Sequence, residues 1–144
     1  MNNPPKILFK YPSRNRPDRF FSSLDSLYNN IDDKDNFLVS CTLDIDDDTM
    51  NNPETVERIK SYKNISIEWG YSTSKINAVN RSMPDYDWDI CVVHSDDMVF
   101  NIYGFDTMIR VDMMTHFPKM DGLLHYPDQD AKEWLATMYI AGRK

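Results

Sequence analysis

Apolar and polar residues alternate along this chain in two periods, one typical of strands and one typical of helices. Short apolar runs bounded by turn residues predict buried strands. These runs span residues 6–11, 36–43, 65–69 and 89–94, with shorter candidates at 121–126 and 137–140. Between them, apolar residues recur three or four positions apart, which predicts helices at residues 17–30, 53–62, 75–83 and 105–117.

The order of these elements predicts the fold class. Strands that alternate with helices form βαβ crossovers, and such crossovers build a mostly parallel sheet. The chain has 144 residues, the size of one domain, and it contains no internal repeat or linker. We therefore expect a single α/β domain over residues 1–144, Rossmann-like, with a central sheet flanked by helices.

Composition and charge exclude several classes of protein. The chain is 41% hydrophobic and 27% charged, as soluble globular proteins are, and no apolar stretch approaches the roughly 20 residues of a membrane span. Its first residues lack the pattern of a signal peptide. The net charge of −7 argues against binding to nucleic acid. Cys41 and Cys91 lie within apolar runs, which predicts free buried thiols and a reducing, cytoplasmic location.

The most informative polar feature is an acidic pair that follows the predicted strand 89–94. Asp96 and Asp97 stand directly after its apolar run. Ligands of open α/β sheets bind outside the carboxyl ends of the strands. Adjacent carboxylates repel each other unless a cation compensates, and Mg²⁺ or Mn²⁺ is commonly held by carboxylates together with substrate phosphates. We therefore expect a divalent-cation site at Asp96 and Asp97, against the alternative of a capped turn, with His94 packed at the strand end.

Basic and amide side chains near two other turns suit a phosphorylated ligand. The turn after the first strand contains Ser13, Arg14 and Arg16, and arginine forks match phosphate geometry. A solvated turn explains these three residues equally well. The short helix before the acidic pair contributes Lys75, which can approach a diphosphate, and Asn80. With glycines only at 70, 104, 122 and 142, no glycine-rich phosphate loop can be drawn.

The turn after the second strand is acidic. Its start resembles a calcium loop, but Thr49 stands where that loop needs glycine, so a calcium site is excluded. Asp44 and Asp46 can instead accept hydrogen bonds from a base or a ribose. For Asp47 and Asp48, capping of the following helix is at least as good an interpretation.

This order of elements resembles the nucleotide-sugar-binding half of GT-A glycosyltransferases, especially the inverting family 2. The likeness is carried by residues 10–16, by Asp44 or Asp46 after the second strand, by the helix 75–80, and by Ser95-Asp96-Asp97, where His94 replaces the usual first acid. The resemblance implies that the first three regions hold the nucleotide. It also implies that Asp96 contacts the ribose and that Asp97 binds the Mn²⁺ or Mg²⁺ that bridges the diphosphate.

The resemblance further implies a metal-dependent transferase domain that binds a nucleotide-diphosphate sugar, with a UDP-sugar favoured. Members of the family continue beyond this length into an acceptor half, so we expect weak transfer or slow donor hydrolysis. The alternative is a non-catalytic nucleotide-sugar-binding module. Asp121 and Asp128 are the candidates for a catalytic base, and His125 lies near them. A Mg²⁺-dependent phosphotransfer or receiver-like domain is a third possibility, but no phospho-accepting aspartate with a matching late lysine stands out. The acceptor and the oligomeric state stay open.

Overall fold

A computed structural model of the chain describes residues 3–81, 83, 85–126 and 139–144. Its elements run in the order β1 (Ile7–Pro12), α1 (Pro17–Asn30), β2 (Phe37–Asp44), α2 (Pro53–Lys60), β3 (Ile65–Gly70), α3 (Lys75–Asn80), β4 (Ile90–Val93), α4 (Phe105–His116), β5 (Leu123–Leu124) and β6 (Tyr139–Gly142).

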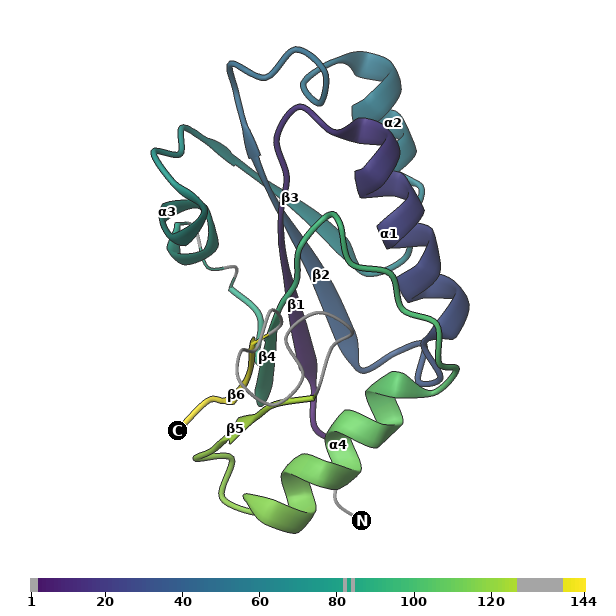
Figure 1. Cartoon of the computed structure of the whole chain (residues 1–144), viewed down its shortest axis with the longest axis vertical. Helices are drawn as coiled ribbons and strands as arrows, with labels where there is room; N and C mark the ends of the chain where they lie inside the picture. Colours follow the sequence, from purple (N-terminus) through teal and green to yellow (C-terminus); the bar gives the residue numbers. More distant parts are fainter. Residues whose placement is uncertain (1–2, 82, 84, 127–138) are drawn as a thin grey trace.

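The strands form one sheet in the order β3-β2-β1-β4-β6-β5, with helices on both faces (Figure 1). The first four strands are mutually parallel, which confirms the predicted α/β class with a mostly parallel sheet. The last two pairings are antiparallel, because β6 runs against both β4 and β5. The predicted strand 121–126 is reduced to two residues. Residues 137 and 138 of the last prediction lie outside the described part of the chain.

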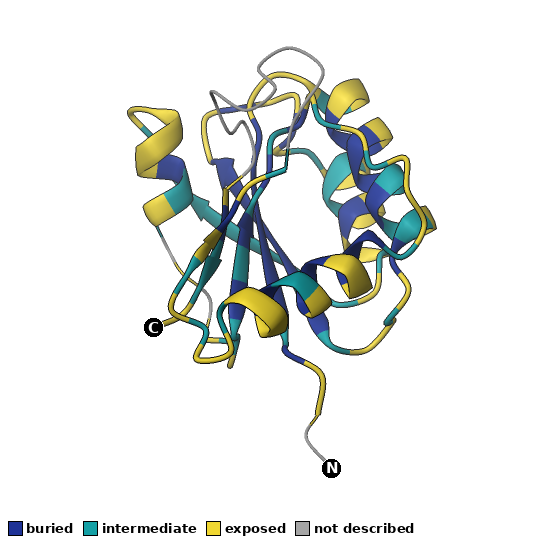
Figure 2. Ribbon diagram, turned by 60° about the horizontal axis from the view of Figure 1, so that its bottom comes forward, coloured by how far each residue is buried: buried dark blue, intermediate teal, exposed yellow. Residues whose placement is uncertain are grey.

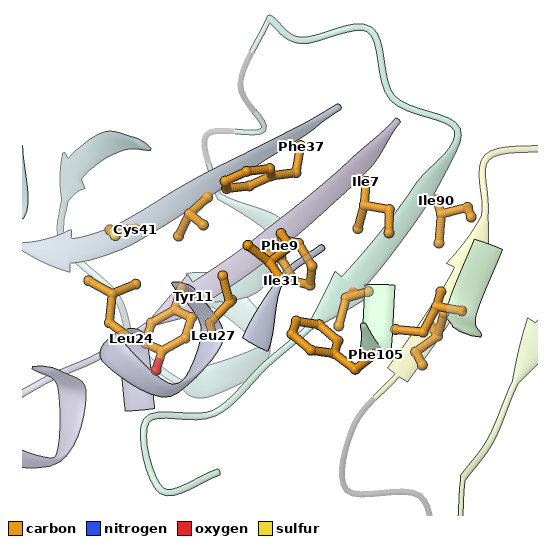
Figure 3. Close-up of a cluster of buried hydrophobic side chains, with 14 of the residues drawn as sticks. Ile7, Phe9, Tyr11, Leu24, Leu27, Ile31, Phe37, Cys41, Ile90 and Phe105 are labelled. Carbon is orange, nitrogen blue, oxygen red and sulfur yellow. The ribbon is translucent and has the colours of Figure 1, made fainter. Parts of the chain in front are cut away.

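The main hydrophobic core lies between the sheet and the helices α1 and α4 (Figures 2 and 3). Alternate residues of β1, namely Ile7, Phe9 and Tyr11, point into it, as the period of a strand requires. From α1, Leu24 and Leu27 meet them at helical spacing. Burial of one such side chain contributes about 1.5–3 kcal/mol, so this layer supplies most of the driving force for folding.

Helix α4 buries Met113, but Met108 and Met114 are 39% and 45% exposed, so only part of that helix belongs to the core. Two sequence-based expectations need correction. Helix α3 ends at Asn80 rather than at Met83. Cys41 is buried as expected, whereas Cys91 is only half-buried; both thiols are free.

The opposite face of the sheet is more polar, and α3 packs against it over β1 and β2 (Figure 1). On β1 this face presents Leu8 and Lys10, both fully buried. The parallel register puts Lys10 beside Ser40 of β2 and Val93 of β4. It also brings the carboxyl ends of β1, β2 and β4 to one edge of the sheet, where α3 begins. No helix in the described part of the chain is long and apolar enough to cross a membrane.

Candidate functional site

A cleft of about 380 Å³ opens at this carboxyl edge. It lies between the turns that follow β1, β2 and β4 on one side and the amino end of α3 on the other. Its lining residues are Pro12, Ser13, Arg14, Arg16, Thr42, Asp44, Ser72, Thr73, Ser74, Lys75, Ala78, Ser95 and Asp96. Of the candidate nucleotide contacts, six therefore meet in one cleft: Ser13, Arg14, Arg16, Asp44, Lys75 and Asp96. The cleft is formed where ligands of open α/β sheets bind.

Asp44 is the acidic centre of the cleft. Its Oδ2 accepts a hydrogen bond from Arg14 Nη1 at 2.7 Å, and its Oδ1 accepts one from Arg81 Nη1 at 3.2 Å. Burial by itself raises the pKa of Asp44, but hydrogen bonds from Arg14, Ser72 and Arg81 outweigh it and hold the pKa below its usual value. The carboxylate is therefore ionised at neutral pH, and it orients two guanidinium groups.

Arg14 also bonds Asp46, with 2.8 Å between Nη1 and Oδ1. Both side chains are about half exposed, so this second pair is open to solvent and contributes little to stability. Asp46 is exposed and does not line the cleft. The structure thus places Asp46 at the rim, as a partner of Arg14.

Asp96 belongs to the turn after β4, yet it is only 6% exposed. Its Oδ2 accepts a hydrogen bond from Ser13 Oγ at 2.8 Å, and its Oδ1 lies 3.4 Å from Arg16 Nη1. Asp96 thereby ties the turn after β4 to the turn after β1. The ion pair with Asp96 also holds Arg16, which is half exposed and lines the cleft.

Asp97 has a different environment although it is the next residue. It is exposed and lines a second groove with Asp18, Arg19 and Ser22, which Asp96 also borders. A hydrogen bond from Ser95 lowers the pKa of Asp97, and the nearby positive charges of Lys75 and Arg16 lower it further. Asp97 is therefore an ionised, accessible carboxylate beside the main cleft rather than within it.

The predicted metal site can be tested against these contacts. Among the described residues, no group of three or more His, Cys, Asp or Glu side chains is arranged to hold a metal ion. Asp96 is occupied by Ser13 and Arg16, whereas Asp97 is exposed and keeps acceptor capacity beside its hydrogen bond from Ser95. One or two carboxylates are enough for Mg²⁺ when substrate phosphates supply further oxygens. The residues present fit a cation site that a ligand completes, and they do not form one on their own.

His94 is packed at the end of β4, as expected. It is 1% exposed, its ring stacks on Phe100 with 4.6 Å between centroids, and its Nε2 lies 3.0 Å from Ser23 Oγ. Burial lowers the pKa of His94 to about 3, so the ring is neutral. Ser23 also donates to the carbonyl of Met98, so this histidine helps fasten the acidic turn to α1.

Within the described part of the chain, the remaining candidates do not enter the cleft. Asn80 is exposed at the end of α3. The antiparallel pairings put Leu123 level with Cys91 and Leu8, so Asp121 precedes β5 at the amino edge of the sheet, away from the cleft. Asp128 lies outside the described residues, and His125 is exposed.

The acidic turn after β2 also has a role that differs from the expected one. Asn52, not Asp47 or Asp48, caps α2, because its side chain accepts a hydrogen bond from the amide of Thr55. Asp47 instead accepts hydrogen bonds from the amide of Asn15, which joins the first two turns, and from Thr49.

Sequence reasoning missed Arg81, and it gave Lys10 no role of its own although residues 10–16 carry the resemblance. Arg81 donates to Asp44, to Ser72 Oγ at 2.6 Å and to the carbonyl of Leu43 at 2.9 Å, so it ties the end of α3 to the end of β2. Nothing in the sequence distinguishes it from a surface arginine. Lys10 did give a signal, because a lysine inside a buried apolar run is uncommon.

Comparison with known proteins adds a fold assignment. No family model matches the chain, and no curated protein matches it. Among solved structures, the mannosyltransferase PcManGT from Pyrobaculum calidifontis, in complex with GDP-Man and Mn²⁺, superposes with a TM-score of 0.69 at 14% identity, over 99% of this chain and 46% of that one. The TarS protein of S. aureus, residues 1–349, superposes with a TM-score of 0.61 at 16% identity, over 76% of this chain and 32% of that one. The chain thus has the fold of GT-A glycosyltransferases and spans less than half the length of either protein.

Proposed function

We propose that the cleft binds a nucleotide-diphosphate sugar and that the chain is the donor-binding domain of a metal-dependent glycosyltransferase. The observation that carries this proposal is the cleft itself, where Arg14, Arg16 and Lys75 surround Asp44 and Asp96 at the carboxyl edge of a GT-A fold. The chain as a whole is acidic, so a cleft with three cationic side chains is a local exception that favours an anionic ligand.

Each side chain has a role suited to its environment. Arg14 and Arg16 are half exposed and forked, so they bind phosphate oxygens while their carboxylate partners keep them oriented. Lys75, at the amino end of α3, adds a further charge. Asp44 and Asp96 each keep acceptor capacity for the base or the ribose, since a carboxylate offers about four lone-pair sites.

Asp97 is the proposed metal ligand, together with the diphosphate of the donor. A divalent cation held there would stabilise the charge that develops on the leaving diphosphate. Asp97 suits this role because it is ionised and exposed beside the cleft. Asp96 then acts mainly by fixing the turn that presents Asp97.

The alternative is a module that binds the donor without transferring the sugar. A general base must lie within hydrogen-bond reach of the hydroxyl that it deprotonates. Among the described residues that line the cleft, the carboxylates are Asp44 and Asp96, and each is paired with an arginine. Both are therefore already engaged by cationic side chains. This observation keeps the alternative open beside the transferase.

Thermal unfolding with nucleotides and nucleotide sugars tests the donor site. We expect UDP or a UDP-sugar with Mn²⁺ to raise the melting temperature well beyond AMP or NAD, because a ligand that binds the native state stabilises it by RT ln(1 + [L]/Kd). GDP and GDP-mannose are included because a structurally similar protein binds GDP-Man. If no nucleoside diphosphate shifts the transition at millimolar concentration, the proposal fails. Acceptor-dependent release of the diphosphate then separates a transferase from a binding module.

A further inference from the structure

Lys10 is a buried cation that the proposed roles leave unused. It lies on β1 with a fully buried side chain. Its Nζ lies 3.0 Å from Thr42 Oγ1, 3.5 Å from Ser40 Oγ and 3.5 Å from the carbonyl oxygen of Arg81. All three partners are neutral. Within the described residues, Lys10 forms no ion pair with any carboxylate.

An ammonium group in such a place costs free energy, because hydrogen bonds to neutral oxygens replace only part of its hydration. Burial accordingly lowers the pKa of Lys10. The charge of Glu68 on β3 opposes this shift most strongly, the thiols Cys91 and Cys41 oppose it more weakly, and Arg81 adds to it. A methionine would fill the same space without this cost. Glu68, which stands beside Thr42 in the sheet, compensates part of the charge but forms no ion pair with Lys10.

Lys10 contacts the cleft lining without lining the cleft itself. Thr42, its nearest partner, is one of the lining residues. Arg81, whose carbonyl is the third partner, binds the lining residue Asp44 through its guanidinium. Lys10 and Arg81 thus add two positive charges one residue behind the cleft lining, in addition to Arg14, Arg16 and Lys75. Since the interior screens charges less than water does, these two charges act on any anion bound in the cleft.

We infer that Lys10 supplies the buried charge that a bound diphosphate compensates, and that it sets the preference of the cleft for diphosphates over less charged ligands. The inference rests on the proposed function, and it identifies Lys10 as the residue whose charge selects the ligand of that site. Lys10 does not touch the ligand in this scheme. It attracts the ligand electrostatically from behind Thr42, so its contribution to affinity grows with the negative charge of the ligand.

Two neutral variants test this role, Lys10→Met and Lys10→Gln, the second of which keeps an N–H donor for Thr42. Calorimetric titration at fixed ionic strength compares uridine, UMP, UDP and inorganic pyrophosphate, with the guanosine series in parallel. We expect the affinity for UDP and pyrophosphate to fall about tenfold, the affinity for UMP to fall less, and that for uridine to stay unchanged. A purely structural role would weaken all of them alike.

Lys6→Met is the matched control, because Lys6 points to the same face of β1 at the far end of the strand. It is partly exposed and pairs with exposed Asp87, so every affinity should change less than twofold. Circular dichroism establishes that each variant folds. If neither Lys10 variant folds, Lys10 is a structural residue and the inference is overturned.

The outcomes separate this inference from the proposed function. Binding of nucleoside diphosphates by the parent, with affinities unchanged in both Lys10 variants, overturns the inference alone. Charge-dependent loss of pyrophosphate binding, with no nucleotide bound by the parent, supports the inference and removes the nucleotide-sugar proposal. If the parent binds neither pyrophosphate nor any nucleotide, both are wrong.

Discussion

Two clusters of aspartate and arginine lie at opposite edges of the sheet, and they differ in how completely they are satisfied. At the amino edge, Asp106 and Arg110 of α4 are 0% and 3% exposed and are joined by a 2.6 Å hydrogen bond. Asp106 also accepts from the amides of Asp32 and Asp33. Arg110 donates to the carbonyls of Pro5 and Asn36, which precede β1 and β2.

At the carboxyl edge the same residue types are left partly open. Arg14 and Arg16 have side chains 46% and 51% exposed, and each is held by one buried carboxylate. Arg14 also pairs with the exposed Asp46 at the rim of the cleft. A closed cluster can only hold the chain together, because its charged groups are buried away from any ligand. An open cluster orients donors that are still available. The two clusters contain the same residue types. Solvent access decides whether such a cluster stabilises the fold or binds a ligand.

The largest effect on stability is expected for Asp106→Asn, which leaves Arg110 buried without its counter-charge. This variant tests whether the closed cluster is structural. Loss of one partner of a buried ion pair typically costs about 3–5 kcal/mol, so we expect a loss of that size in the free energy of unfolding. Urea denaturation measures it. Asp87→Asn is the control, because Asp87 is 83% exposed and forms only surface pairs, so its loss should cost less than about 1 kcal/mol. Equal losses in the two variants would contradict a closed structural cluster.

A smaller effect on stability is expected for Asp44→Asn at the open cluster. Arg14 can turn to solvent, whereas Arg81 is left largely buried, so we expect a loss of about 1–2 kcal/mol. The folded pKa of Asp44 is below its usual value, so its stabilisation is present above about pH 4 and disappears as the pH falls further.

Urea titrations of the parent and of Asp44→Asn at pH 7 and pH 3 measure this difference. The gap in unfolding free energy should narrow at the lower pH. Asp46→Asn is the exposed control and should leave the free energy of unfolding nearly unchanged at either pH. A gap that widens in acid would show that the carboxylate of Asp44 is not held ionised by its arginine partners.

The smallest effect on stability is expected for Asp97→Ala, because Asp97 is exposed on a turn. We expect unfolding free energy to stay within about 0.5 kcal/mol of the parent, while the metal-dependent part of nucleotide binding is abolished. Calorimetric titration of UDP with and without Mn²⁺ measures this part. Asp96→Ala, which breaks the link to Ser13, should instead weaken binding in both conditions. Equal loss with and without metal in Asp97→Ala would argue against a metal ligand.

Much of the fold could be predicted from the sequence, because it depends on periodicity that single residues carry. The run 36–43 is apolar enough to be buried on two faces, and it forms β2. Pro17 and the helical spacing of Phe20, Leu24 and Leu27 define α1. The pairing of the last two strands, β5 and β6, was harder to predict. It depends on which edge of the sheet remains unpaired once β4 is in place.

The site could be predicted in outline only. Polar turns after three parallel strands must meet at one edge, and this rule brought Ser13, Asp44 and Asp96 into the same cleft. The rule does not predict the direction in which each side chain of a turn points. Asp96 and Asp97 are neighbours in sequence, yet one faces Ser13 and Arg16 while the other faces solvent, because successive side chains of a turn point to different sides.

By itself, then, the sequence determined the α/β class, the parallel core of the sheet and the edge at which polar residues gather, since each follows from local patterns. Only the tertiary structure decided which charges are buried. Asp106 and Arg110, four residues apart on a helix, look like a surface pair until α4 packs over the starts of β1 and β2. Lys10 becomes a buried cation only when neighbouring strands and α3 enclose it. The burial of a charged group depends on every surrounding element, and it controls how strongly that group interacts with other charges.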